Sequence, residues 1–168
     1  MTNELSSPIC YGPQADDAYM GYAPRDEILA ALKELLEAER AGARVALASA
    51  RSEAASPYRD LMLAVRADEA RWCAMLSGQI KRLGGTPSRK TGGFYAKALA
   101  ISGALDRLAF LNRGQGWIVR KLEALTPRIR DEILYADLRA MLDSHRTNID
   151  RACGLLDPKS DADARLKL

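Results

Sequence analysis

Four long segments of this chain repeat apolar residues at steps of three and four, which is the period of an α-helix with one buried face. They span about residues 24–54, 57–83, 99–125 and 133–157. Each is long enough to form a helix of several turns, and no segment alternates with the period of two that a half-buried strand would need. The pattern therefore predicts an all-α protein whose helices bury their apolar stripes against one another.

The connections between these segments predict the topology. Ser56 and Pro57 separate the first two segments by a short turn, so these helices should be antiparallel neighbours. Gly84 and Gly85 form a natural left-handed C-cap pair at the end of the second segment. The Gly-rich and Ser-rich stretch that follows is long enough, at about 3.3 Å per residue, to run almost the length of the bundle. We therefore expect a four-helix bundle, up-down-down-up, with a long crossover between helices two and three.

Composition limits the class of protein. The 168 residues, 48% of them apolar, suit one domain, which we place at residues 24–157 between an irregular N-terminal arm (1–23) and a polar C-terminal tail (158–168). No apolar run approaches the roughly 20 residues that a membrane helix needs, and the first residues lack the features of a signal peptide. We therefore expect no membrane partner and a cytoplasmic location.

Charge and cysteine content exclude two further classes. The 25 basic and 22 acidic residues are too balanced for a surface that tracks nucleic-acid phosphates. Cys10, Cys73 and Cys153 lie far apart without a CxxC motif, so we expect reduced thiols rather than a disulfide framework or a structural zinc site.

One polar residue interrupts each apolar stripe near the middle of its helix: Glu39, Glu69, Gln115 and His145. Each lies at heptad or helical spacing from apolar neighbours, so all four should face the core. Helices of matched length that pack side by side bring their midpoints to one level. The sequence thus predicts one buried polar layer that contains two carboxyl groups, an amide and an imidazole.

Two segments carry a resemblance to bacterioferritins, rubrerythrins and related ferritin-like proteins. The first, residues 32–40, is LKELLEAER, and the second, residues 68–88, is DEARWCAMLSGQIKRLGGTPS. In that superfamily the Glu of the LxxLLxxE pattern and the Glu of a following ExxH motif bind metal. The resemblance places Glu39 and Glu69 at these two positions, while Trp72 stands where the His should be.

The other two helices depart further from the superfamily pattern. Gln115, in RGQGW, best matches the Glu of the third helix. HRTNID, residues 145–150, fits the second ExxH motif with His145 for the Glu and Asn148 for the His. A shifted register instead places His145 on the His and Leu142 on the Glu. The chain is identified as a member of an uncharacterised bacterial branch of the superfamily with altered ligand positions.

These replacements define two functional hypotheses. In the first, the layer keeps a reduced site for a single Fe, Mn or Zn ion, with Glu39 and Glu69 as anionic ligands, His145 as the nitrogen ligand, and Gln115 or Asn148 orienting bound water. In the second, the protein is a metal-free structural or interaction bundle with a hydrogen-bonded layer, in which a protonated His145 and a nearby arginine neutralise the two glutamates.

Five further expectations accompany these hypotheses. Trp72 should pack in the core beside the layer, and Arg66, one turn before Glu69, is the arginine best placed to reach the carboxylates in the absence of metal.

Gly114 and Gly116 each cost up to about 1 kcal/mol inside a helix relative to Ala, which predicts a close approach there, by tight packing rather than by a ligand. The sequence RKTGG, residues 89–93, lacks the spacing of a phosphate loop and is expected to be a plain connection. Finally, bundles of this kind often pair by their sides, so we expect a homodimer.

Overall fold

The computed structural model describes residues 20–157. Most of the predicted arm (1–19) and the whole predicted tail (158–168) lie outside the described residues. In chain order the elements are α1 (Arg25–Arg51), α2 (Pro57–Arg82), α3 (Phe94–Leu99), α4 (Ala104–Leu125), the 3-10 turn η1 (Thr126–Arg128) and α5 (Glu132–Leu156). Within residues 20–157 none of these helices combines the length and hydropathy that a membrane crossing requires.

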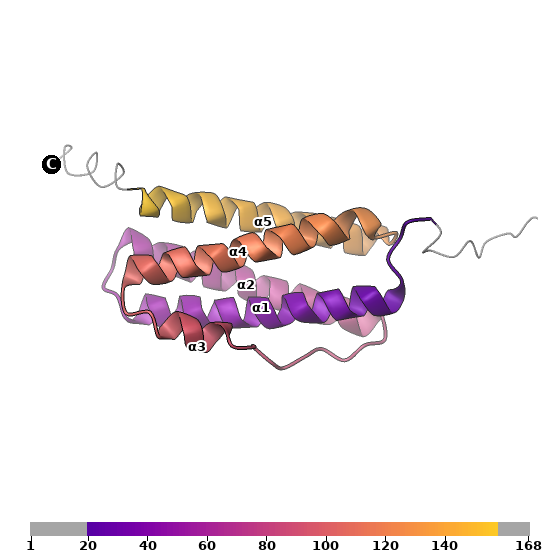
Figure 1. The fold of residues 1–168 in the computed structure, drawn as a ribbon, viewed down its shortest axis with the longest axis horizontal. Helices are drawn as coiled ribbons and strands as arrows, with labels where there is room; N and C mark the ends of the chain where they lie inside the picture. Colours follow the sequence, from indigo (N-terminus) through magenta and orange to yellow (C-terminus); the bar gives the residue numbers. More distant parts are fainter. Residues whose placement is uncertain (1–19, 158–168) are drawn as a thin grey trace, which may run out of the picture.

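The four long helices form the expected up-down-down-up bundle (Figure 1). Helix α1 packs beside α2 and α4, and α5 packs beside the same two helices, so α1 lies diagonally across from α5 and α2 from α4. The connection after α2 runs back along α1 before the short α3 and the start of α4, which makes α2 and α4 parallel. The predicted crossover between the second and third long helices is therefore confirmed.

The turn signals in the sequence fix the ends of α2. The Ser56 hydroxyl accepts a hydrogen bond from the Arg59 N–H at 3.2 Å, and Pro57 occupies the first helical position. At the other end Gly84 adopts the left-handed conformation, with φ +74°. Gly85 does not, but a Cβ there would lie 2.7 Å from the Leu29 side chain, so this position needs a small residue. Gly84 thus serves through its backbone conformation, and Gly85 through the absence of a side chain.

At the starts of two helices, residues that we predicted to lie on buried apolar stripes face solvent instead. The third long helix begins at Ala104 rather than near Leu99, because Gly103, with ψ 130°, interrupts the helical backbone. Leu99 instead ends α3, and Leu105 in the first turn of α4 is 54% exposed. Ile133, in the first turn of α5, is 63% exposed, whereas its neighbour Leu134 is fully buried. Helical spacing alone placed these exposed residues on the wrong face.

The core consists of two apolar clusters, one toward each end of the bundle. The cluster nearer the start of α1 includes Leu32, Leu36, Leu76, Leu122, Leu138 and Leu142. The cluster nearer the end of α1 includes Val45, Met62, Val65, Leu108, Leu111 and Ala152. Along every long helix the polar residue of the predicted layer lies between members of these two clusters. Apolar packing therefore covers the layer toward both ends of the bundle.

Candidate functional site

The four long helices each contribute one buried polar residue to the layer: Glu39 from α1, Glu69 from α2, Gln115 from α4 and His145 from α5. None of these side chains is more than 3% exposed. Their helical positions follow from the apolar stripes on either side, which turn the same helix face toward the core. The bundle therefore brings together two carboxyl groups, an amide and an imidazole away from bulk water.

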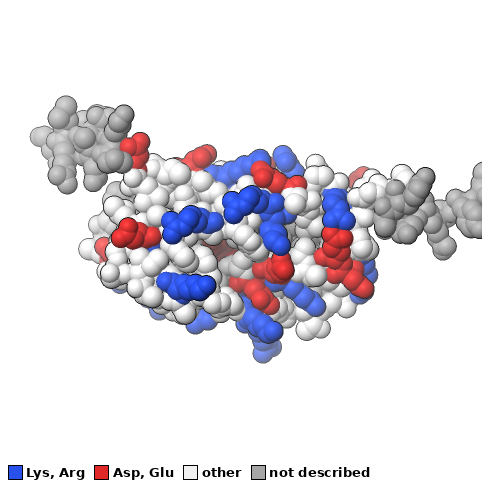
Figure 2. Space-filling view, viewed as in Figure 1, with Lys and Arg blue, Asp and Glu red and all other residues white. Residues whose placement is uncertain are grey.

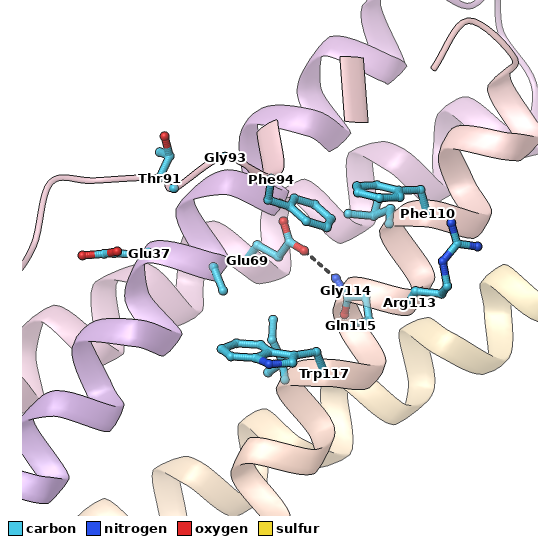
Figure 3. Close-up of a pocket in the computed structure, with 15 residues that line it drawn as sticks. Glu37, Glu69, Thr91, Gly93, Phe94, Phe110, Arg113, Gly114, Gln115 and Trp117 are labelled. Atoms are coloured by element: carbon cyan, nitrogen blue, oxygen red, sulfur yellow. Dashed lines mark hydrogen bonds between the residues drawn. The ribbon is translucent and has the colours of Figure 1, made fainter. Parts of the chain in front are cut away.

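These side chains form a continuous chain of contacts across the bundle. The Gln115 amide nitrogen donates a hydrogen bond to Glu69 Oε1, as the dashed line in Figure 3 marks. The amide oxygen of Gln115 accepts a hydrogen bond from His145 Nδ1. His145 Nε2 in turn lies 3.0 Å from Glu39 Oε1. With the amide in this orientation Nδ1 carries a proton, and Nε2 is the nitrogen presented to the carboxyl group of Glu39.

Several atoms of the layer have no hydrogen-bond partner within the part of the chain that the structure describes. They are Glu39 Oε2, Glu69 Oε2 and Asn148 Oδ1, while Glu39 Oε1 and His145 Nε2 have no partner besides each other. Buried polar atoms are nearly always hydrogen-bonded, because leaving one unsatisfied costs about 1–3 kcal/mol. Several unsatisfied atoms at one level of the bundle indicate that a further group, beyond these side chains, completes their hydrogen bonding or coordination.

Asn148 and an unpredicted residue, Asp68, form a second polar contact beside the layer. The Asn148 amide nitrogen donates to Asp68 Oδ2 at 3.1 Å, and the Ser144 hydroxyl donates to the same oxygen at 3.2 Å. Asp68 precedes Glu69 on α2 and is only half-buried, which is why its sequence position gave no sign of this role. Asn148 is thereby held by α2 through its nitrogen, and its oxygen remains unpaired.

The two residues predicted to surround the layer behave differently. Trp72 is 5% exposed and belongs to the apolar cluster nearer the start of α1, so its predicted core packing is confirmed. Arg66 is exposed, so the expectation that it balances the carboxylates does not agree with its position. A guanidinium at the surface is solvated, and reaching the layer from there would require burying its charge.

Leu142 and Asn148 are both buried, so burial favours neither of the two registers proposed for His145.

Two glycines make the layer and its surroundings possible. A Cβ at Gly42 on α1 would lie 2.5 Å from both carboxyl oxygens of Glu69, so the absence of a side chain there creates the space for that carboxyl group. A Cβ at Gly114 would lie 2.8 Å from the ring of Phe94, which comes from α3. The close approach predicted at Gly114 is thus confirmed, but Gly114 and Phe94 also line a cavity, so packing does not replace a cavity there. At Gly116 the nearest atom is an Arg120 nitrogen at 3.6 Å, an ordinary contact.

A cavity of about 410 Å³ opens beside the layer, between α1 and α4. Residues 91–93 of the crossover and Phe94 lie along its outer side, so this connection shapes the cavity in addition to linking helices (Figure 3). Glu69 and Gln115 are the layer residues that line it. Figure 2 shows a hollow in the middle of this face, with basic and acidic side chains mixed around it. The buried layer is therefore connected to a site that a small molecule can enter.

Burial controls the electrostatics of the two glutamates. Desolvation raises the pKa of Glu69 well above its ordinary value, and the nearby Glu39 charge raises it further, while the Gln115 hydrogen bond lowers it. Desolvation also raises the pKa of Glu39, although His145 opposes this effect. Burial raises the pKa of the Cys73 thiol, which lies near both glutamates, to about 12, so this cysteine is an unreactive thiol.

These pKa shifts predict the pH dependence of stability in protein kept metal-free with a chelator. A carboxyl group whose pKa is raised by folding binds its proton more tightly in the folded state. The free energy of unfolding should therefore be greatest near or below pH 4.5 as far as Glu69 is concerned, and fall as the pH rises from there through the raised pKa. The slope for one proton is at most about 1.4 kcal/mol per pH unit.

Urea denaturation between pH 5 and 8 measures this slope. Glu69→Gln keeps the size of the side chain and an oxygen that accepts from Gln115, and it should flatten the slope. Glu53→Gln, at an exposed position, should leave the slope as in the natural protein. Equal slopes in all three proteins would show that Glu69 stays ionised throughout this range.

Comparisons with known proteins agree with this architecture. The chain is similar to a ferritin-like, diiron-carboxylate protein from Bacillus anthracis str. Ames, with a TM-score of 0.69 and 18% sequence identity, and the match covers 79% of this chain and 97% of that one. This similarity establishes a ferritin-like fold. No curated protein matches the chain. Residues 26–154, which include every residue of the polar layer, match the model of one family. The chain therefore belongs to the family described as Domain of unknown function (DUF6306).

Proposed function

We propose that the polar layer binds a single divalent transition-metal ion, with His145 Nε2 and Glu39 as its first two ligands. The observation that carries this proposal is the isolated pairing between them: the two atoms lie 3.0 Å apart, and neither has any other partner among residues 20–157. Because Gln115 accepts a hydrogen bond from His145 Nδ1, Nε2 is the ring nitrogen whose lone pair a metal ion would take.

The spacing of these two atoms suits two ligands of one cation. Nitrogen and oxygen ligands at about 2.1 Å from a metal ion lie about 3.0–3.4 Å apart when the angle between them is 90–109°. The hydrogen bond from His145 Nδ1 to Gln115 is the kind of outer contact that fixes the orientation and tautomer of a metal-binding histidine. An imidazole with carboxylate and water ligands is suitable for Fe, Mn or Zn.

The same residues do not suit a pair of metal ions. Within residues 20–157 no three His, Cys, Asp or Glu side chains are in position to hold even one metal ion, so a site for one ion requires a side chain to move and a site for two would need further ligands. Trp72 and Gln115 occupy positions where the resemblance would require an imidazole and a carboxylate, and Glu69 is engaged with Gln115. The proposed site therefore holds one ion between Glu39 and His145, completed by water and by Glu69 once it turns from Gln115. Such an ion would supply Lewis acidity or, for Fe and Mn, redox chemistry.

Metal content and calorimetry test this proposal. Protein purified from metal-supplied cultures is expected to carry about one Fe, Mn or Zn ion per chain, and metal-free protein should bind one equivalent in titration. Glu39→Gln and His145→Gln should each weaken binding at least about 100-fold, because each removes a direct ligand. Glu53→Gln is the matched control, since it neutralises an exposed carboxylate far from the layer.

The alternative is a metal-free structural bundle, which the continuous contacts from Glu69 to Glu39 favour. Under it the layer serves to fix helix register. Purified protein without stoichiometric metal, combined with no saturable binding to metal-free protein, would support this alternative and contradict the proposed site. Circular dichroism of each variant separates a lost ligand from a lost fold.

A further inference from the structure

The cavity beside the layer has aromatic walls that come from both the bundle and the crossover. The rings of Phe94 on α3 and Phe110 on α4 are stacked, with centroids 4.8 Å apart and planes inclined by 23°. Trp117, further along α4, lines the cavity from the other side (Figure 3). Gly114 lies between these positions and lets the Phe94 ring approach α4. The walls are thus suited to a flat or flexible apolar group.

The inner end of the cavity is polar and incomplete. The side chain of Glu69 lines the cavity, and the residue is 1% exposed. Its Oε1 accepts a hydrogen bond from Gln115, whereas Oε2 is buried without a partner among the described residues. Gly42 leaves the space in which this carboxyl group lies. A molecule that fills the cavity therefore meets an apolar wall along its length and one unpaired carboxyl oxygen at its end.

The charges around the cavity favour a cation over an anion. Two lining residues are acidic, Glu37 and Glu69, and one is basic, Arg113. The Arg113 guanidinium lies 5.5 Å from the centre of the Phe110 ring, and Glu37 accepts a hydrogen bond from the Ser88 hydroxyl of the crossover. The basic group is thus associated with a wall of the cavity, whereas the inner end presents a carboxyl group. An anionic ligand there would face a carboxyl group that has no basic partner in the cavity lining to offset it.

We propose that this cavity binds a small primary amine with an apolar body, whose nitrogen donates to Glu69 Oε2 while its body packs against Phe94, Phe110 and Trp117. An amine suits this position whichever partner carries the proton. An ammonium ion donates to the carboxylate, whereas a protonated Glu69 would donate to a neutral amine, so one hydrogen bond joins the two groups in either state, and the charged form is the stronger one. A hydrocarbon of the same shape would leave Oε2 unsatisfied. This amine site uses the Glu69 carboxyl group that would also complete the proposed metal site, so amine binding has to be tested in metal-free protein.

Calorimetric titration of the full chain with 2-phenylethylamine tests the proposal. The experiment is performed with a chelator present, so that its outcome is separate from that of metal binding. The amine is expected to bind one equivalent at least tenfold more tightly than 2-phenylethanol, which has the same body and a neutral head, and 3-phenylpropionate should not bind measurably. Binding of the alcohol and the amine with equal affinity, or of neither, would overturn the proposal.

Two variants locate the site. Glu69→Gln should weaken 2-phenylethylamine at least tenfold while 2-phenylethanol binds as before, and Glu53→Gln should change neither. Phe94→Ala removes a wall supplied by α3, outside the four long helices, but Phe94 also packs against the core cluster nearer the end of α1, so circular dichroism has to show that the variant stays folded. It should weaken both ligands by a similar factor and preserve the preference for the amine. An amine affinity that survives Glu69→Gln, or that is unchanged in Phe94→Ala, would place binding elsewhere and refute the assignment.

Discussion

His145→Leu is expected to lower the free energy of unfolding of the metal-free protein by about 3–5 kcal/mol at pH 7. The substitution removes both contacts of the imidazole at once. Glu39, which is fully buried, loses the group 3.0 Å from its Oε1, and the Gln115 oxygen loses its hydrogen-bond donor. Leucine fills most of the vacated volume, so the cost arises chiefly from polar groups left unsatisfied in an apolar surrounding.

A double-mutant cycle separates this cause from simple repacking. Glu39→Leu/His145→Leu should recover much of the stability that His145→Leu loses, because replacing both partners of a buried polar pair with apolar residues is often nearly neutral. Urea denaturation of the natural protein, both single variants and the double variant gives the coupling energy. Additive losses, with no recovery in the double variant, would show that Glu39 and His145 contribute independently.

The pH dependence of the same variant provides a second measurement. His145 opposes the rise in the pKa of Glu39 that burial causes, so without the imidazole this pKa should rise further. The cost of His145→Leu should then shrink as the pH falls toward 4.5, where Glu39 takes up a proton in both the folded and the unfolded state. A cost that is constant between pH 5 and 8 would contradict this account.

The location of the polar layer could be predicted from the sequence because helical period and helix length are both local properties. Glu39 and Gln115 each lie within an apolar stripe near the middle of a helix, and the structure buries both at one level of the bundle. The fold followed from the same information, together with the short turn at Ser56 and the long crossover. Where only spacing was available, at Leu105 and Ile133, the predicted face was wrong.

The contacts within the layer could not be predicted in this way. Helical period indicates that Gln115 faces the core, but not that its two amide atoms connect Glu69 on one helix with His145 on another. That arrangement depends on side-chain rotamers and on which helices lie diagonally across the bundle. Similarly, Arg66 lies one turn from Glu69 in sequence, yet its side chain is directed to the surface.

The cavity depends on residues that are distant in sequence, which is why helical patterns did not predict it. Phe94 follows what we expected to be a plain connection, and only the folded crossover brings its ring against Gly114. The role of Gly42 could not be predicted for a different reason. It lies in the middle of a strong helical pattern, where a single glycine is tolerated, and nothing local indicates that it faces the carboxyl group of Glu69. An unexplained glycine in a helix interior was the one available signal.

Gly42→Leu is therefore expected to lower the free energy of unfolding by about 2–4 kcal/mol. A leucine Cβ would occupy a point 2.5 Å from both carboxyl oxygens of Glu69, so that side chain has to leave its position. The displacement breaks the hydrogen bond from Gln115 and forces a buried carboxyl group and a bulky side chain to compete for one space. These costs exceed the roughly 1 kcal/mol that removing a glycine from a helix interior usually contributes in favour of folding.

Gly78→Leu provides the matched control, because it makes the same change on α2 at an exposed glycine, where an added Cβ would have no atom within 4 Å. It should be neutral or stabilise the protein by up to about 1 kcal/mol. Adding Glu69→Ala to Gly42→Leu removes the displaced carboxyl group, so the double variant should be more stable than Gly42→Leu alone. If Gly42→Leu matches Gly78→Leu in urea denaturation, Glu69 moves freely into the cavity and the space at Gly42 is not required. A large loss that Glu69→Ala does not relieve would instead trace the cost to the surrounding helices rather than to the carboxyl group.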